Sequence, residues 1–199
     1  MHASEEYQFR VFASPVGPYF KGGVRPLVIR VCDLDRAATR GTGHIKASLN
    51  YAMSLYALTE AHALGYDENL YVDSATRTYV EETGGANIIF AEGPKKVVVP
   101  ISGTILPSIT RRSLTYIARE YLGLEVEERR VELKELDRFT ECGLCGTAAV
   151  ISPVGTIVDH GKEIHYVGMG PTIQKLYDTL TGIQMGRLEA PEGWIQIIE

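Results

Sequence analysis

The stretch "GTGHIKASLNY" (residues 41–51) sets a single lysine, Lys46, between a glycine-rich tract and the start of an apolar run. Residues 34–49 show little periodicity and carry two close glycines, which predicts a loop. In residues 50–64 the apolar positions fall near one helical face, and Gly65 follows as a residue that typically ends a helix. The residues of that face are Ala52, Leu55, Tyr56, Thr59 and Ala63. The pattern predicts a loop that presents a lysine just before a helix.

Composition limits the class of protein. The chain has 199 residues, of which 45% are hydrophobic and 23% charged, so it can bury a sizeable core as one large domain or two small ones. Its net charge of −5 argues against a nucleic-acid partner held by phosphate contacts. The sequence has neither an apolar run long enough to span a membrane nor an N-terminal signal peptide. Three cysteines, an odd number, favour a reducing cytosol over a disulfide framework.

Strands and helices are predicted to mix without regular alternation. Residues 7–15 and 25–33 read as strands because they are rich in β-branched and aromatic residues. Further strands are predicted at 69–73, 77–82, 86–92, 95–100 and 124–133, with a strand, a turn and a strand within 142–158. Further helices are predicted at 106–123, 134–139 and 171–186. This order predicts the α+β class rather than a doubly wound sheet.

Each local motif also has an ordinary interpretation. A loop lysine is usually a solvated charge, and residues 41–48 lack the spacing of a P-loop or of a dinucleotide-binding loop. The start "LPSITR" (106–111) could be a plain helix cap. The pair Cys142 and Cys145 has no second CxxC or spaced histidine pair to complete a zinc site, so no metal is expected. A lone CxxC on a predicted strand is only weakly indicative of redox chemistry.

Read together, five ordered segments give a more specific signal. They are "GTGHIKASLNY" (41–51), "EETGGANIIF" (81–90), "ILPSITRRSL" (105–114), "CGTAAVISPV" (145–154) and "GPTIQKLYDTLTGIQMGRLEAPEGW" (170–194). In this order they closely resemble the branched-chain amino acid aminotransferases, class IV enzymes that use pyridoxal 5'-phosphate. The resemblance runs from about residue 7 to the end. It implies the mixed-sheet large domain of fold type IV, which D-amino acid aminotransferases and aminodeoxychorismate lyases share.

The resemblance assigns chemistry to residues of the first segment. Lys46 matches the lysine that forms a Schiff base with the cofactor aldehyde and moves a proton between substrate and cofactor. Because its amine must be uncharged for part of the cycle, a buried Lys46 is expected. Tyr51 matches a tyrosine whose hydroxyl lies beside cofactor and substrate, although on its own it could equally be a core residue of the helix.

Other implied residues hold the ring and the phosphate. The family spacing Glu-x-Gly-x-x-Asn selects Glu82 as the carboxylate beside the pyridine nitrogen and leaves Glu81 solvated on the opposite face of the strand. Gly85 lies where the family backbone passes close to the cofactor. The phosphate is expected at Ile109 and Thr110, at a helix N-terminus, and at Thr147. The backbone amides of Thr147 and Ala148 match the receptor of the substrate carboxylate.

The resemblance also predicts an organisation and partners. Residues 1–33 match the end of a small domain with the interdomain segment, residues 34–199 match the large domain, and the family's preceding small domain is missing. We therefore expect a homodimer or association with a chain that supplies that domain, with Tyr19, Phe20, Val24 and Leu27 near the junction. The implied reaction is transamination of branched-chain amino acids with 2-oxoglutarate in the cytoplasm. A cofactor-binding pseudo-enzyme or subunit, or one of the two related activities, remains the alternative.

Overall fold

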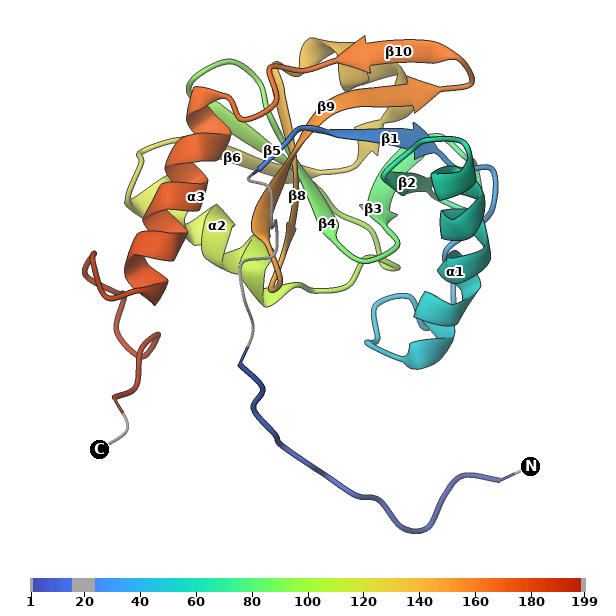
Figure 1. Cartoon of the computed structure of the whole chain (residues 1–199), viewed down its shortest axis with the longest axis horizontal. Helices are drawn as coiled ribbons and strands as arrows, with labels where there is room; N and C mark the ends of the chain where they lie inside the picture. The colour runs from blue at the N-terminus through green and yellow to red at the C-terminus, as the bar shows by residue number, and fades with distance from the viewer. Residues whose placement is uncertain (1, 16–23, 198–199) are drawn as a thin grey trace.

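A computed structural model describes residues 2–15 and 24–197 and contains one mixed sheet flanked by helices (Figure 1). The strands are β1 Leu27–Val31, β2 Glu68–Val72, β3 Tyr79–Thr83, β4 Asn87–Ala91, β5 Lys96–Pro100, β6 Glu125–Arg129, β7 Val131–Glu132, β8 Glu141–Gly146, β9 Val150–Asp159 and β10 Lys162–His165. The helices are α1 Ser48–Ala63, α2 Ile109–Glu120, the 3-10 helix η1 Leu133–Arg138, and α3 Pro171–Gln184. Helices α2 and α3 lie together on one side of the sheet, and α1 lies on the other side of the molecule (Figure 1).

The sheet curls back on itself. Its strand order is β6-β5-β4-β8-β9-β1-β2-β3-β7, with β10 paired to β9. The two end strands, β6 and β7, are separated in sequence by Arg130 alone, so the two edges of the sheet must lie close together. Strand β1 pairs in parallel with β2 and β9, and β5 pairs in parallel with β6, while the other pairs are antiparallel. The mixed sheet confirms the predicted α+β class.

The core has two parts because the central strands are covered on both faces. Every residue of β4 is buried, and neighbouring side chains point to opposite faces. Phe90 packs in the cluster enclosed by the curled sheet, where its ring stacks on Phe139 at a centroid distance of 4.6 Å. Ile89 packs in the second cluster, with Ile117 of α2 and Leu176 of α3.

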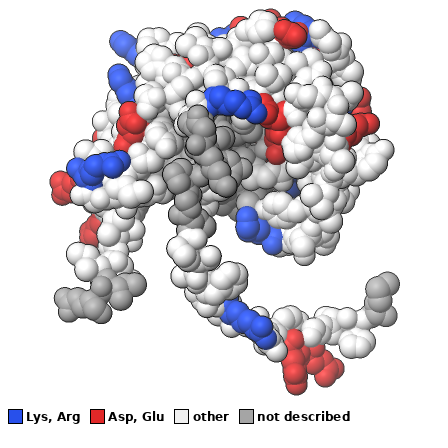
Figure 2. All heavy atoms as spheres, in the orientation of Figure 1, with Lys and Arg blue, Asp and Glu red and all other residues white. Residues whose placement is uncertain are grey.

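Helix α1 packs through a different face from the predicted one. Its buried residues are Asn50, Ser54, Ala57 and Ala61, at helical spacing, whereas all five residues of the predicted face are exposed. The small side chains let the helix approach the sheet closely, and the larger apolar side chains are left pointing outward. Leu49, Met53 and Tyr56 are 54%, 53% and 71% exposed. The region over α1 also shows few charged side chains in Figure 2.

The strand predicted at residues 7–15 is wrong. This segment has no secondary structure and extends away from the sheet (Figure 1). Tyr7, Phe9 and Val11 alternate as a strand would, but each is more than 80% exposed. An alternating apolar pattern forms a strand only where a neighbouring strand supplies backbone hydrogen bonds. Among the described residues, no strand pairs with residues 7–15. Tyr19 and Phe20 lie outside the described residues.

Most other predicted elements are confirmed, with two differences. The strand predicted at 124–133 is two strands, β6 and β7, which pair with β5 and β3 at opposite ends of the sheet. Strand β10 was not predicted, and it forms a hairpin with β9 through His160 and Gly161, both at positive φ. Within residues 2–15 and 24–197, no helix is long and apolar enough to cross a lipid bilayer.

Candidate active site

Four separate stretches of chain meet around one cavity of about 220 Å³. They are the loop before α1, the turn between β3 and β4, the segment before α2, and the turn between β8 and β9. The lining residues are Arg36, Lys46, Tyr51, Glu82, Gly84, Gly85, Ala86, Asn87, Leu106, Ser108, Cys145, Gly146, Thr147 and Ala148. Six of the eight site residues predicted from the sequence are among them, although they come from elements far apart in the chain.

Lys46 and Tyr51 contribute an amine and a phenol that touch each other. The Lys46 Nζ atom donates a hydrogen bond of 3.3 Å to Tyr51 Oη. The same ammonium lies 5.3 Å from the centre of the Tyr51 ring. The expectation of a buried Lys46 is wrong, because its side chain is exposed. It lines a cavity that is open to solvent on its side, so an incoming small molecule can reach the amine.

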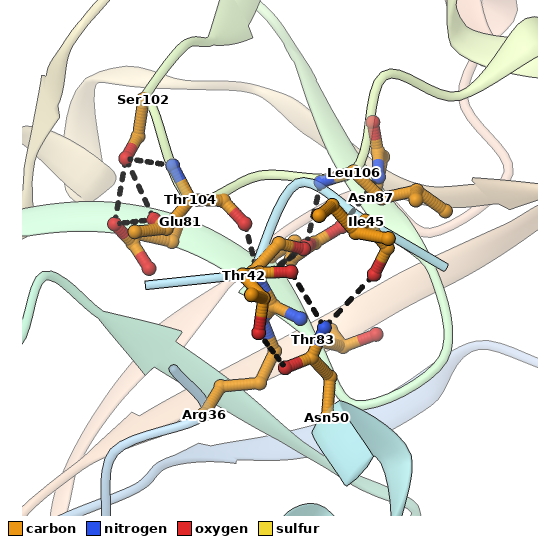
Figure 3. Close-up of polar contacts among 12 residues, drawn as sticks. Arg36, Thr42, Ile45, Asn50, Glu81, Thr83, Asn87, Ser102, Thr104 and Leu106 are labelled. Carbon is orange, nitrogen blue, oxygen red and sulfur yellow. Dashed lines mark hydrogen bonds and ion pairs between the residues drawn. The ribbon is translucent and has the colours of Figure 1, made fainter. Parts of the chain in front are cut away.

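Asn50 holds the loop that carries Lys46, a function that sequence reasoning missed (Figure 3). This buried side chain donates from Nδ2 to the carbonyl oxygens of Thr42 and Ile45, both at 2.8 Å. Gly43 in the same loop packs so tightly that an added Cβ would lie 2.5 Å from the Thr104 carbonyl oxygen. The sequence did carry a signal for this contact. An asparagine in the first turn of a predicted helix can donate its side-chain N–H groups to carbonyl oxygens of the preceding loop.

Replacing Asn50 with Ala is expected to loosen this loop. The change removes two hydrogen bonds and leaves two carbonyl groups without that donor, which lowers the free energy of unfolding by about 2 kcal/mol. Urea denaturation measures the loss, and proteolytic cleavage within residues 40–46 should accelerate. Ser48→Ala, at an exposed neighbouring position, is the control. Equal stability and equal cleavage in the two variants would contradict the clamp.

Glu82 is a buried carboxylate with partners on both oxygens. Its Oε1 accepts from the Leu106 backbone N–H at 2.9 Å and lies 2.8 Å from Arg36 Nη2. Its Oε2 accepts from Asn87 Nδ2 at 2.6 Å. Burial raises the pKa of Glu82 from 4.5 to about 7, against the charge of Arg36 and the Leu106 N–H, which lower it. The carboxyl therefore titrates near neutral pH.

Glu81 lies on the opposite face of β3, as predicted, but it is not solvated. It is only 3% exposed and accepts hydrogen bonds from Ser102 Oγ, at 2.7 Å, and from Thr104 Oγ1 (Figure 3). The loop after β5 folds over this face of the strand and covers the carboxylate. The alternation of a strand correctly separated the two glutamates, but it carried no information on what covers the far side.

The turn between β8 and β9 brings Thr147 and Ala148 to the cavity. Both residues, with Gly85 and Gly146, also line an adjoining cavity of about 270 Å³. A Cβ placed on Gly85 meets no atom within 4 Å, so this position opens into free space. The turn ends at Val150, whose φ of 62° is unusual for a β-branched residue. Such backbone strain is often found at functional sites.

Two predicted residues do not line the cavity. Ile109 is 69% exposed and faces a separate groove, and Thr110 is buried but does not reach the cavity. The segment just before α2 takes their place through Leu106 and Ser108. Ser108 is the N-cap of the helix, and its Oγ accepts from the Arg111 backbone N–H at 3.2 Å.

The CxxC pair is structural. Cys142 and Cys145 are both fully buried in β8 and belong to the two different core clusters, on opposite faces of the sheet. Their side chains therefore cannot join in a disulfide. Burial raises the pKa of Cys145 to about 12, so its thiol is not activated as a nucleophile. The residues that the structure describes contain no cluster of three or more side chains able to hold a metal ion.

Comparison with known proteins decides the family. The family described as amino-transferase class IV matches residues 3–157. The chain belongs to the class IV aminotransferase family. Among its relatives in this family is the branched-chain-amino-acid aminotransferase of Haemophilus influenzae, which is 47% identical over 98% of this chain and 59% of the relative. The protein of the same name from Helicobacter pylori is 44% identical over 96% of this chain and 57% of the relative.

Solved structures of the class IV aminotransferase family agree with the fold. The branched-chain amino acid aminotransferase of Thermobaculum terrenum, in its PLP form, superposes with a TM-score of 0.74 at 34% identity. The match covers 82% of this chain and 52% of that one. The Escherichia coli enzyme gives a TM-score of 0.74 at 28% identity, over 85% and 56% of the two chains. This chain therefore spans a little more than half the length of the relatives it matches.

Proposed function

We propose that this chain is the cofactor-binding part of a pyridoxal-phosphate-dependent aminotransferase that transfers amino groups from branched-chain amino acids to 2-oxoglutarate. The observation that carries the proposal is the convergence of Lys46, Tyr51 and Glu82 on one cavity. The names of the relatives support the substrate class, since several are branched-chain-amino-acid aminotransferases. The open cavity beside Lys46 is compatible with a small amino acid as substrate.

The residues present fit pyridoxal phosphate. Lys46 offers an amine for the aldehyde, and Glu82 offers a buried carboxylate for the pyridine nitrogen. The free space at Gly85 leaves room for a planar ring. Thr147, and Ser108 at the start of α2, would hold the phosphate through hydroxyl groups and nearby backbone N–H groups. Ile109 and Thr110 do not line the cavity, and we infer that the backbone N–H groups at this helix N-terminus, on which their prediction rested, serve the phosphate.

Each residue then has a distinct function in the transfer. The bound cofactor supplies an electron sink for negative charge at the substrate Cα. Glu82 keeps a proton on the ring nitrogen, and Lys46 carries a proton to and from the substrate Cα. The Tyr51 hydroxyl, in contact with Lys46 Nζ, directs the amine. The N–H groups of Thr147 and Ala148 orient the substrate carboxylate.

We also propose a domain organisation and an association. Residues 34–199 form the large domain and residues 1–33 the link to a small domain, although β1 itself lies within the sheet between β2 and β9. The outward apolar face of α1 and the exposed segment 7–12 support association with a second copy or with a chain carrying a small domain. The free, buried thiols of Cys32, Cys142 and Cys145 support a cytosolic location.

An absorption spectrum tests the proposal directly. The purified chain is titrated with pyridoxal phosphate, and L-leucine or D-alanine is then added. The experiment is repeated in the presence of the part of the Haemophilus influenzae relative that this chain does not cover. Conversion of the bound cofactor to its pyridoxamine form by leucine supports the proposal. Binding without conversion in either setting would favour a cofactor-binding subunit, conversion by D-alanine alone would favour the related D-amino acid activity, and absence of binding would refute all three.

A further inference from the structure

An arginine that the sequence did not single out, Arg36, lies against Glu82 in the loop after β1. Arg36 is 5% exposed and its Nη2 atom lies 2.8 Å from Glu82 Oε1. The same nitrogen donates to the carbonyl oxygens of Thr104 and, at 3.3 Å, Gly43. Arg36 also lines the cavity that holds Lys46. The guanidinium therefore joins the carboxylate of the site to two loops.

The loop that receives Arg36 is itself fixed by the second glutamate of β3. Ser102 Oγ and Thr104 Oγ1 both donate to Glu81 Oε1, and they contact each other at 2.8 Å (Figure 3). The Thr104 residue thus binds Glu81 through its side chain and Arg36 through its backbone carbonyl. A chain of polar contacts therefore runs from Glu81 through Thr104 and Arg36 to Glu82. It links two adjacent glutamates that lie on opposite faces of β3.

Charge explains why this geometry matters. A buried carboxylate without a partner is protonated rather than ionised, because burial penalises the charged form. Of the groups that face Glu82, the charges of Arg36 and Arg111 and the Leu106 N–H lower its pKa, whereas the negative charge of Glu81 raises it. The Lys46 ammonium and the Cys145 thiol line the same cavity. Arg36 is the cation in direct contact.

We propose that Arg36 is a positioning residue, which favours the ionised form of Glu82 and fixes its direction across the cavity, while Glu81 holds Arg36 in place through Thr104. This inference rests on the proposed function, in which the ionised Glu82 keeps a proton on the cofactor ring. It adds one arginine and one structural carboxylate to a site that the sequence described by Lys46, Tyr51 and Glu82.

Carboxyl titration in the chain without any cofactor tests the proposal. The full chain is labelled with 13C at glutamate side chains, and the Glu82 signal is assigned by its absence in Glu82→Gln. In Arg36→Gln the Glu82 midpoint is expected to rise by about one pH unit or more, because a contacting cation is lost. Arg40→Gln, which removes an exposed arginine of the same loop, should leave the midpoint unchanged. An unchanged midpoint in a folded Arg36→Gln would overturn the proposal.

A second measurement needs no change at Arg36, in case that variant does not fold. In the unmodified chain the Arg36 side-chain 15N signal is expected to shift with pH at the Glu82 midpoint, and Glu82→Gln should abolish the shift. Glu81→Gln should leave the Arg36 signal present but broaden or move it, because the Thr104 clamp is weakened. An Arg36 signal insensitive to the Glu82 titration would refute the contact. Since no cofactor is present, these outcomes are independent of whether pyridoxal phosphate binds.

Discussion

Replacing Glu82 with Gln is expected to slow the leucine-driven conversion of bound pyridoxal phosphate by roughly 100- to 1,000-fold. The amide cannot hold a proton on the ring nitrogen as a carboxylate does, and it leaves the buried Arg36 without its charged partner. A slowing of this size corresponds to about 3–4 kcal/mol of lost transition-state stabilisation, the magnitude typical of removing one preorganised polar group from an active site. Stopped-flow absorbance at saturating cofactor measures it. Glu81→Gln, on the other face of β3, acts on Glu82 only through Thr104 and Arg36 and should slow the conversion far less.

The same substitution makes a prediction about pH and stability. Because the pKa of Glu82 is raised from 4.5 to about 7 in the folded chain, the folded state holds a proton that the unfolded chain releases in that window. The free energy of unfolding should therefore fall as pH rises from about 4.5 to about 7, by on the order of 3 kcal/mol from this group. Glu82→Gln should lack this slope and Glu81→Gln should retain it. If Glu81→Gln slowed the leucine-driven conversion more than Glu82→Gln does, the assignment of the two glutamates would be reversed.

Association is the second large effect expected. Leu49, Met53 and Tyr56 form a stripe along α1 that is more than half exposed, an arrangement rare on stable monomers. We expect the chain to sediment as a two-fold dimer, the commonest closed symmetry, or to bind a chain that carries a small domain. Mixing with the part of the Haemophilus influenzae relative that this chain does not cover should produce leucine aminotransferase activity where neither piece alone has any.

Substitutions in the α1 stripe test this association. Met53→Glu and Tyr56→Glu place charges in the stripe without touching the buried face of the helix, so folding should be preserved while association weakens at least tenfold. Lys175→Glu, at an exposed position on α3, serves as the control. A chain that sediments as a monomer at all concentrations and gains no activity on mixing would contradict the proposed association.

The elements and much of the site could be predicted because their signals are local. The glycines near Lys46, the Glu-x-Gly-x-x-Asn spacing around Glu82 and the CGTA turn carry the resemblance to the family, and each lies within a few residues of sequence. The strand alternation of β3 also separated Glu81 from Glu82 correctly. What the sequence could not report is which distant segments cover a given face. That is why the cover over Glu81 and the contact between Arg36 and Glu82 were missed.

The errors follow from the same limit. The packing face of α1 could not be predicted from hydrophobicity, because close approach to the sheet selects small residues such as Ser54 and Ala57 over large ones. The apolar alternation in 7–15 predicted a strand that has no partner among the described residues. Ile109 and Thr110 were carried over from the resemblance, and only the start of α2 shows that Leu106 and Ser108 lie nearer the cavity.

Reduction with borohydride followed by peptide mass mapping tests the central claim most directly. The chain is loaded with pyridoxal phosphate, reduced, digested and analysed by mass spectrometry, with Lys46→Ala as the control. Lys46 alone among the lysines contacts Tyr51 and lines the cavity in the described structure. The account predicts a stoichiometric pyridoxyl label on Lys46 and its loss in Lys46→Ala. A label on Lys95, Lys96 or Lys162 instead, retained in Lys46→Ala, would contradict it.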